Sequence, residues 1–375
     1  MRILQLIATT QRRGAELFAG ALSDALRKRG HEVAVWAVSA KGKGGAGGEL
    51  EVDRVLRPTG KVRWRIQDSA GLARAARAFA PDLMQASGGS TTTVAAVAAW
   101  LDPGRCWQLV YRNIGDPLVW FSSPWRRLFY RAVVWPNIDG VVSGSNLARA
   151  GLEGLFGSRL PPCRVVFRGV VEDHLQPTRS REHVREELGA QSDHVVLVWV
   201  GALSPEKRPD RALKVLRRCV LSEAPTVLWM VGDGPLGRET ECLADELGIA
   251  DRVRWIGVVD DVGTYLHAAD VFLQTSDTEG VPGALLEAMT VGLPSVVTRV
   301  GGIPEVVEES MTGFLVPPDD EDALGERLVR LSADPDLRRQ LGENAARAAQ
   351  GLFGMRRCAA EHEEFYQWLR KVPKC

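Results

Sequence analysis

Two glutamates, Glu279 and Glu287, stand eight positions apart in the stretch of the chain that is richest in chemical signals. The apolar run 270–274 before them predicts a buried strand, and the run 284–289 has the composition of a helix. Glu279 therefore lies in the loop between strand and helix, and Glu287 lies about one turn inside the helix. Carboxylates in these places suit neutral hydroxyl groups, such as those of a sugar or a ribose.

The turn between these two elements has the composition of an anion site. Its residues are Gly280, Val281, Pro282 and Gly283. Proline suits the first position of a helix, and glycines allow backbone amides to approach a ligand closely. Because the N-terminus of a helix favours phosphate, the stretch predicts a phosphate beside sugar or ribose hydroxyls. The alternative is that the acidic residues only cap the helix and complement its dipole.

The glutamate pair is followed by Gly-Leu-Pro at 292–294 and Gly-Gly-Ile-Pro-Glu at 301–305. Together these features resemble the retaining GT-B glycosyltransferases of family four (glycosyl transferases group 1), and the resemblance covers most of the chain. It implies an α/β fold with two Rossmann-like, doubly wound parallel-sheet domains that face a central cleft. It also implies that Glu279 contacts the transferred sugar and that Glu287 contacts the ribose of the nucleotide.

The pattern along the chain agrees with two domains. The 375 residues exceed what one core usually supports, and strands alternate with helical stretches, which predicts parallel sheets covered by helices on both faces. With the resemblance, we expect an acceptor-binding domain at 1–172, a nucleotide-sugar-binding domain at 190–352 and a last helix at 353–375 that crosses back to the first domain. The predicted strands are 3–7, 32–36, 83–85, 108–111, 140–143 and 164–167, then 194–200, 227–231, 253–256, 271–274 and 295–297. The glycine-rich run 41–48 predicts a loop tip.

The segment 201–208, which follows the first strand of the second domain, ends in Lys207 and Arg208. It resembles the family's strand-to-helix turn whose basic residues grip the donor diphosphate, with Lys207 as the firm match. Many relatives have an arginine directly after the first glycine, where this chain has Ala202, and Arg208 is the candidate to replace it. A cation here would stabilise charge on the departing diphosphate without a metal. The alternative is a pair of solvated basic side chains at a helix start.

The segment 231–237 matches the Gly-x-Gly-x-x-Gly pattern after a strand, which also occurs in dinucleotide-dependent dehydrogenases. However, the next strand ends at Gly257, where a dinucleotide site needs an acidic residue for the ribose. Family four has a similar Gly-Asp-Gly-Pro turn. The resemblance therefore implies that Gly232 and Gly234 shape the nucleotide pocket and that Gly257 and Val258 flank the base.

Two loops of the first domain are candidates for the acceptor side. The first keeps half of the family's Gly-Gly-x-Glu turn: Gly14 offers a close backbone approach, and Arg13 replaces the first glycine. Arg13 is a candidate contact for acceptor or phosphate, or part of a basic surface loop. The second loop follows a strand end, where open α/β sheets bind ligands, and it contains Arg112, Asn113 and Asp116 in place of the family's usual histidine. These residues could orient an acceptor, although a capped turn explains Asp116 as well.

The segment 119–131 mixes aromatic residues with arginines, as helices at a membrane interface do. It predicts either peripheral membrane contact with a lipid-linked acceptor, or a helix whose aromatic face lies in the core of the first domain. The start of the chain, 1–7, reads as a strand rather than a signal peptide, and no apolar run approaches membrane-spanning length. We therefore expect a cytoplasmic protein, either free or at the inner face of the membrane.

The composition of the chain argues against several classes of function. Lys+Arg and Asp+Glu each number 47, so the formal net charge is zero and offers no case for nucleic acid as a partner. The cysteines are scattered without a Cys-x-x-Cys and the histidines are isolated, so neither a metal site nor a disulfide framework is predicted.

These observations and the resemblance predict an enzyme, a retaining glycosyltransferase. It would move a sugar from a nucleotide-sugar donor to a hydroxyl of a glycan, a lipid-linked saccharide or a small molecule. The resemblance implies a same-face mechanism without cofactor or metal, in which the leaving phosphate oxygen takes the acceptor proton. The alternatives are a nucleotide-sugar epimerase or hydrolase of the same fold, and a noncatalytic protein that binds sugar nucleotides.

Overall fold

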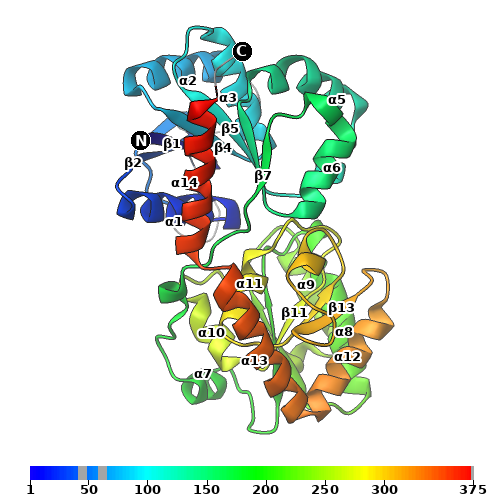
Figure 1. Cartoon of the computed structure of the whole chain (residues 1–375). Coiled ribbons are helices and arrows are strands. Elements are labelled where there is room, and N and C mark those ends of the chain that lie inside the picture. Colours follow the sequence, from blue (N-terminus) through cyan, green and yellow to red (C-terminus); the bar gives the residue numbers. More distant parts are fainter. Residues whose placement is uncertain (41–48, 58–65, 373–375) are drawn as a thin grey trace. The chain divides into compact units, whose positions relative to one another are not determined.

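The computed structural model describes residues 1–40, 49–57 and 66–372, so the predicted loop tip at 41–48 lies outside the described residues. The chain divides into two compact units. Unit 1 comprises Met1–Gly169 and Met355–Cys375, and unit 2 comprises Val170–Gly354. Figure 1 shows that helices and strands alternate along both units.

In the described part of the chain, unit 1 contains a seven-stranded parallel sheet with the order β3-β2-β1-β4-β5-β6-β7. Its strands are β1 (Arg2–Thr9), β2 (Glu32–Ser39), β3 (Arg54–Arg57), β4 (Leu83–Ser87), β5 (Gln108–Asn113), β6 (Gly140–Ser143) and β7 (Cys163–Val165). Its helices are α1 (Gly14–Lys28), α2 (Ile66–Phe79), α3 (Gly89–Leu101), α4 (Pro117–Trp120), α5 (Pro124–Phe129), α6 (Asn146–Phe156) and α14 (Met355–Lys371), with short turns η1 (Tyr130–Val134), η2 (Trp135–Asn137) and η3 (Gly157–Arg159).

Unit 2 contains a six-stranded parallel sheet with the order β10-β9-β8-β11-β12-β13. Its strands are β8 (Val195–Val200), β9 (Thr226–Val231), β10 (Val253–Gly257), β11 (Val271–Gln274), β12 (Ser295–Thr298) and β13 (Gly313–Val316). Its helices are α7 (Arg181–Glu187), α8 (Pro209–Leu221), α9 (Gly237–Glu246), α10 (Val262–Ala268), α11 (Gly283–Thr290), α12 (Glu321–Ala333) and α13 (Pro335–Leu352), with short turns η4 (Glu172–Leu175), η5 (Pro205–Lys207), η6 (Ala250–Arg252) and η7 (Ile303–Glu305).

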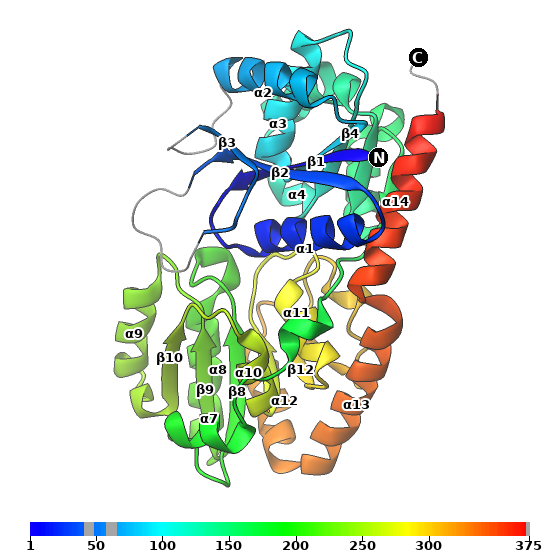
Figure 2. The same cartoon turned by 90° about the vertical axis from the view of Figure 1, so that its left-hand side faces the viewer.

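Helices cover both faces of the sheet in unit 1. Figure 2 shows α1 on one side of the sheet and α2 and α3 on the other. The last helix, α14, shares the core of α1, because its buried Phe365 and Leu369 pack with Phe18 and Val110. A Cβ on Gly140 of β6 would lie only 2.7 Å from Leu369 Cδ1, so glycine there allows α14 to lie close to the sheet. The prediction of two Rossmann-like, doubly wound parallel sheets is confirmed.

Each sheet has one position where the direction of strand order reverses. In unit 1 this position lies between β1 and β4, and in unit 2 it lies between β8 and β11. Loops on the two sides of such a switch point diverge, and open α/β sheets bind ligands at the carboxyl ends of these strands. The loops that follow β8 and β11 contain Lys207 and Glu279, so the fold brings the two strongest sequence candidates to one edge.

No helix in the described part of the chain is long and apolar enough to cross a membrane. The cysteines at 106, 163, 219, 242 and 358, which are those within the described residues, are free thiols.

Candidate active site

Glu279 lies in the loop between β11 and α11 and is 9% exposed. Its backbone is held by the neighbouring loop, since Gly302 N–H donates to the Gly280 carbonyl oxygen over 2.8 Å. Gly301 has φ +52°, and a Cβ there would lie 1.8 Å from the Glu279 carbonyl oxygen. The Gly-Gly-Ile-Pro-Glu motif therefore allows two backbone segments to touch at the point where Glu279 is presented.

The Glu279 carboxylate is fixed by three donors on one of its oxygens. Oε1 accepts hydrogen bonds from Lys207 Nζ at 2.5 Å, Gln274 Nε2 at 2.5 Å and Ser276 Oγ at 2.7 Å. The Glu279 side chain is 8% exposed and that of Lys207 is 26% exposed. Charge-assisted hydrogen bonds of this kind are the strong ones, so the carboxylate is oriented before any ligand arrives.

Lys207 reaches Glu279 because the loops after β8 and β11 are bonded to each other. Thr275 Oγ1 donates to the carbonyl oxygens of Lys207 and Arg208, at 3.2 and 2.9 Å. Asp277 N–H donates to the Glu206 carbonyl oxygen at 2.9 Å. These bonds place the end of η5 against the loop that carries Glu279. Lys207 and Glu279 are 72 positions apart in the sequence, and they meet because β8 and β11 are adjacent in the sheet.

Arg208 is bound to carboxylates of its own unit. Its guanidinium donates to both Asp210 oxygens at 2.8 Å and to Asp277 at 3.2 Å. The hydrogen bond with Asp210 raises the pKa of Arg208, and the same bond lowers the pKa of Asp210. The backbone of Arg208 is left-handed, with φ 50° and ψ 58°, a conformation that costs energy for a residue with a side chain.

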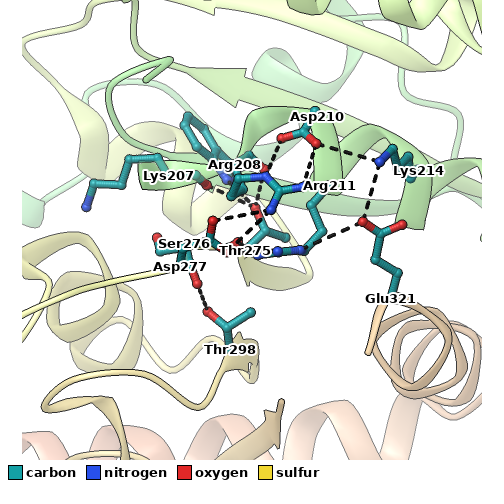
Figure 3. Close-up of polar contacts among 11 residues, drawn as sticks. Lys207, Arg208, Asp210, Arg211, Lys214, Thr275, Ser276, Asp277, Thr298 and Glu321 are labelled. Atoms are coloured by element: carbon teal, nitrogen blue, oxygen red, sulfur yellow. Dashed lines mark hydrogen bonds and ion pairs between the residues drawn. The ribbon is translucent and has the colours of Figure 1, made fainter. Parts of the chain in front are cut away.

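These carboxylates belong to a larger polar network, which Figure 3 shows. Arg211 is 4% exposed, donates to the Thr275 carbonyl oxygen at 2.6 Å and pairs with Asp277 at 2.8 Å. Lys214 and Glu321 continue the network at 3.6 Å. The network stiffens the loops on both sides of the switch point. Whether the Arg208 guanidinium also meets a donor diphosphate stays a prediction.

Gly232 and Gly234 allow the loop after β9 to pack on the loop after β8. A Cβ on Gly232 would lie 1.9 Å from the Gly201 carbonyl oxygen, and one on Gly234 would lie 2.4 Å from that of Leu203. Gly232 N–H in turn donates to the Gly257 carbonyl oxygen at 2.7 Å. These glycines have a packing role in three neighbouring loops, and their contact with a nucleotide stays a prediction, as does that of Val258, which is 43% exposed.

The start of α11 is suited to an anion. Pro282 is the N-cap residue and makes no side-chain hydrogen bond to the first turn, which begins at Gly283. Gly280, Val281 and Gly283 are half-buried, and so is Glu287 in the second turn. Uncapped backbone N–H groups at a helix N-terminus are a general phosphate site.

The predicted acceptor-side residues lie at the carboxyl edge of the sheet in unit 1. Arg13 is the exposed N-cap of α1, and Gly14 is the first residue of that helix. Asp116 caps α4 by accepting from Leu118 N–H at 2.8 Å, as the turn alternative expected. Asn113 is buried, accepts from Tyr111 OH at 2.8 Å and donates to the Gly115 carbonyl oxygen at 3.0 Å. Arg112 is also buried, on the face that α1 covers.

The aromatic segment 119–131 divides between core and surface. Phe121 and Tyr130 are 1% exposed and pack edge to face at 4.7 Å between ring centroids. Trp125 and Leu128 are 79% and 56% exposed. The core interpretation therefore holds for part of the segment, and the outward-facing part leaves an apolar surface with arginines beside it.

Several residues of this site are not singled out by the sequence. Gln274, Ser276, Arg211 and Asp277 hold Glu279 or its loop, and no motif marks them. Only their position in the fold could have indicated them. Gln274 ends the strand β11, and Ser276 and Asp277 follow it, at the edge of the sheet where open α/β sheets bind ligands. In the described residues, no group of three or more His, Cys, Asp or Glu side chains is placed to hold a metal ion.

Two doubly wound units in one chain, with a lysine and a glutamate at the switch point of the second, are the architecture of a GT-B glycosyltransferase. Two family models match: Glycosyltransferase Family 4 over residues 12–174 and Glycosyl transferases group 1 over residues 180–348. Together the models span most of the chain. The chain belongs to the group 1 glycosyltransferases of family four.

Solved structures share the fold over nearly the whole chain. Anabaena HepE in complex with UDP and glucose has a TM-score of 0.82 at 22% identity, over 98% of this chain and 100% of that one. Sucrose-phosphate synthase from Thermosynechococcus elongatus has a TM-score of 0.81 at 21% identity, over 98% of each chain.

Curated relatives match over part of their length. The N-acetyl-alpha-D-glucosaminyl L-malate synthase of Bacillus anthracis is 29% identical over 52% of this chain and 51% of its own. The D-inositol 3-phosphate glycosyltransferase of Saccharomonospora viridis is 32% identical over 63% of this chain and 57% of its own. The matched part of this chain thus spans little more than half of these relatives.

Proposed function

We propose that this protein is a retaining glycosyltransferase that transfers a sugar from a nucleotide-sugar donor, bound by unit 2, to a hydroxyl of an acceptor bound by unit 1. The observation that carries the proposal is the Lys207–Glu279 pair at 2.5 Å, at the carboxyl edge of β8 and β11. A carboxylate fixed by three donors can receive sugar hydroxyls, and the adjacent ammonium can meet a diphosphate. These are the two chemical parts of a nucleotide sugar.

Each candidate has a part in the reaction. Lys207 and the uncapped start of α11 stabilise the charge that develops on the leaving diphosphate, which is electrostatic transition-state stabilisation. Glu279 holds the sugar hydroxyls through the oxygen that its protein partners leave open. Glu287, in the second turn of α11, receives the ribose diol.

The anomeric configuration is retained because the acceptor hydroxyl attacks the same face of the sugar from which the diphosphate departs. The acceptor hydroxyl approaches the anomeric carbon as the bond from that carbon to the diphosphate oxygen breaks, and this oxygen takes the hydroxyl proton. The diphosphate leaves with that proton, and the new bond to the acceptor oxygen has the orientation of the old one. No protein base and no metal takes part in the step.

The names of the relatives guide the choice of acceptors and donors to test. The names of the two curated relatives include malate and inositol 3-phosphate, so small hydroxylated acids and phosphates belong in the first acceptor panel beside glycans. HepE was solved with UDP and glucose, which makes UDP-sugars the first donors to test.

The exposed part of segment 119–131 supports contact with an anionic membrane surface at the cytoplasmic face. Trp125 and Leu128 are exposed, and Arg126 and Arg131 beside them are exposed as well. Aromatic and apolar side chains with arginines are the composition of an interfacial surface. Wild type should sediment with vesicles that contain phosphatidylglycerol, Trp125→Ser should not, and Trp100→Ser, an exposed tryptophan of α3, should behave as wild type. Equal sedimentation of both variants would refute membrane contact here.

The first experiment uses the purified protein, a panel of nucleotide sugars and no acceptor. Thermal shift and released nucleoside diphosphate are recorded for wild type, Glu279→Ala, Lys207→Ala and the surface control Arg339→Ala, whose side chain is 66% exposed. One donor should stabilise wild type and Arg339→Ala and be hydrolysed slowly, and both site variants should lose that hydrolysis.

The same experiment separates the alternatives. An epimerase would convert the donor, without acceptor, into an equilibrium mixture of two nucleotide sugars, which sugar analysis of the remaining donor detects. A noncatalytic binder would be stabilised by a donor but would release no nucleoside diphosphate from it. Absence of stabilisation by every donor would refute the assignment of the Glu279–Glu287 segment.

A further inference from the structure

Unit 1 has buried polar atoms without partners at the carboxyl edge of its sheet. Arg112, on β5, is 7% exposed, and Ser87, at the end of β4, is 6% exposed. Among the described residues, neither Nη1 of Arg112 nor Oγ of Ser87 has a hydrogen-bond partner. The two residues are paired in register on adjacent strands, so their side chains lie on the same face of the sheet. Buried polar groups are rarely left unsatisfied.

In the part of the chain that the structure describes, no acidic side chain compensates the Arg112 charge. Its guanidinium carbon lies 3.9 Å from the ring centre of Phe18, and the guanidinium carbon of Arg168 lies 5.5 Å from the same ring. Burial first, and then the nearby Arg168 charge, lower the pKa of Arg112 to about 10, so the group remains charged at neutral pH. Burying a charge without an opposite charge is costly, and here two cations share one aromatic ring.

The side chains that α14 packs near this guanidinium are neutral. Burial lowers the pKa of His362 to about 3, and its Nδ1 donates to the Cys358 carbonyl oxygen at 2.8 Å. Burial raises the pKa of the Cys358 thiol to about 11 and raises that of Tyr366 further. None of the three supplies a negative charge to Arg112 at neutral pH.

The start of α1 adds a third element on the same face. Phe18 belongs to α1, and Nη1 of Arg168 lies 3.4 Å from the position that a Cβ on Gly14 would take. The N-cap Arg13 makes no side-chain hydrogen bond to the first turn. The carboxyl of Glu16 in that turn is buried, which raises its pKa, and it is bonded to backbone groups of Glu16 and Thr9. Gly14 thus lets an arginine approach a helix N-terminus.

We propose that Arg112, Arg168, Ser87 and the N-terminus of α1 form a subsite for one anionic group, a carboxylate or a phosphate monoester, carried by the acceptor. The switch point between β1 and β4 is where such a ligand would enter. Guanidinium groups bind these anions through paired N–H donors, and stacking on an aromatic ring holds their plane. The bound anion supplies the charge that Arg112 lacks. The assignment to the acceptor rests on the proposed function, whereas the anion site itself does not.

The site is tested first with inorganic phosphate, without any sugar. Phosphate should raise the melting temperature of wild type and of Lys207→Ala, which removes the donor-side cation of unit 2. Arg168→Gln and Arg112→Gln should weaken phosphate binding at least about tenfold, and the exposed control Arg74→Gln should not. In buffer free of phosphate and other multivalent anions, Arg112→Gln should melt at a higher temperature than wild type, because an unpaired buried charge is gone.

The outcomes separate a structural arginine from a ligand-binding one. If Arg112 were purely structural, Arg112→Gln would lower the melting temperature with and without phosphate, and Arg168→Gln would bind phosphate like wild type. Loss of the phosphate effect in Lys207→Ala alone would place the anion in unit 2. Either result overturns the subsite.

The acceptor assignment is tested with matched pairs, glycerol with glycerol 3-phosphate and glucose with glucose 6-phosphate, using whichever donor wild type hydrolyses. Wild type should prefer the anionic member of each pair, and the ratio of kcat/KM between the two members should fall at least about tenfold in Arg168→Gln. An unchanged ratio, together with phosphate binding, would make this a site for free anion only and refute the acceptor role. If no donor is hydrolysed, the proposed function fails while the phosphate result still decides the subsite.

Discussion

Replacing Glu279 by glutamine should make a nucleoside diphosphate bind more tightly, although it removes a residue that we place in the site. In the structure Lys207 Nζ donates to Glu279 Oε1 over 2.5 Å. A diphosphate that needs Lys207 must compete with this carboxylate for the same ammonium. Glu279→Gln keeps the size of the side chain and an oxygen for Gln274 and Ser276, but it removes the charge that holds Lys207.

The expected gain in diphosphate affinity depends on how exposed the Lys207–Glu279 ion pair is. The Lys207 side chain is 26% exposed and that of Glu279 is 8% exposed, so the pair lies between a surface ion pair, worth about 0–1 kcal/mol, and a buried one, whose disruption costs about 3–5 kcal/mol. We take about 1–2 kcal/mol as the energy that restrains Lys207. Its release then tightens diphosphate binding by about 5- to 30-fold.

The assay is isothermal titration calorimetry with UDP, which has no sugar and so does not report the lost sugar contact. Wild type, Glu279→Gln, Lys207→Met and the double variant form a cycle. The gain should vanish in the Lys207→Met background, and Glu326→Gln, an exposed acid of α12, controls for the change in net charge. Equal or weaker UDP binding by Glu279→Gln would refute the idea that Lys207 exchanges Glu279 for a diphosphate.

Three further predictions concern stability and pH. Gly301→Ala should lower the free energy of unfolding by about 2 kcal/mol or more and abolish donor hydrolysis, because its Cβ would lie 1.8 Å from the Glu279 carbonyl oxygen; urea titration of both proteins measures it. Asp270→Asn should cost about 3 kcal/mol at pH 7 by leaving Arg185 without its charged partner. Burial raises the pKa of Asp270, but the Val196 N–H and the Arg181 and Arg185 charges lower it by more, so the folded pKa lies below the unfolded one. The Asp270 carboxylate therefore stabilises the fold above the unfolded pKa, and the difference in unfolding free energy between wild type and Asp270→Asn should close as pH falls below about 4. His362→Leu should make the protein less sensitive to acid. Burial lowers the pKa of His362 to about 3, so between about pH 6.5 and 3 the unfolded chain binds a proton that the folded protein does not. The unfolding free energy of wild type should therefore fall by up to about 1.4 kcal/mol per pH unit in this range, and that of the variant should fall less.

The sheets could be predicted from the sequence wherever a strand was a long apolar run. The runs at 194–200 and 227–231 correspond to β8 and β9, whose residues are almost all buried. Two strands were not predicted. The edge strand β3, Arg54–Arg57, has no buried residue, so its apolar pattern is weak. The strand β13, Gly313–Val316, is buried, but it begins with a glycine, a residue that is depleted in strands. Short strands are defined by their neighbours in the sheet rather than by their own composition.

The candidate site could be predicted in its motifs but not in its partners. The lysine and the glutamate were named from the sequence, whereas their direct bond arises because β8 and β11 are adjacent in the sheet. The partners of Arg208 could not be predicted for the same reason, since Asp277 comes from another loop. A resemblance identifies residue types at known positions. The protein groups that each side chain contacts before a ligand binds depend on the tertiary structure.

The two candidate ligand edges differ in how their buried charges are satisfied, and this difference agrees with the separate functions that we propose for them. In unit 2, the Glu279 carboxylate has three donors on one oxygen, so its orientation does not depend on a ligand. In unit 1, Arg112 has an aromatic ring and a second arginine beside it, and no acidic side chain of the described residues pairs with it. A satisfied charge contributes pre-organisation, which suits the donor sugar because its position sets the stereochemistry of transfer. An unsatisfied buried charge lowers the stability of the empty protein and raises its affinity for the ligand that completes it, which suits selection among acceptors that share a hydroxyl and differ in charge.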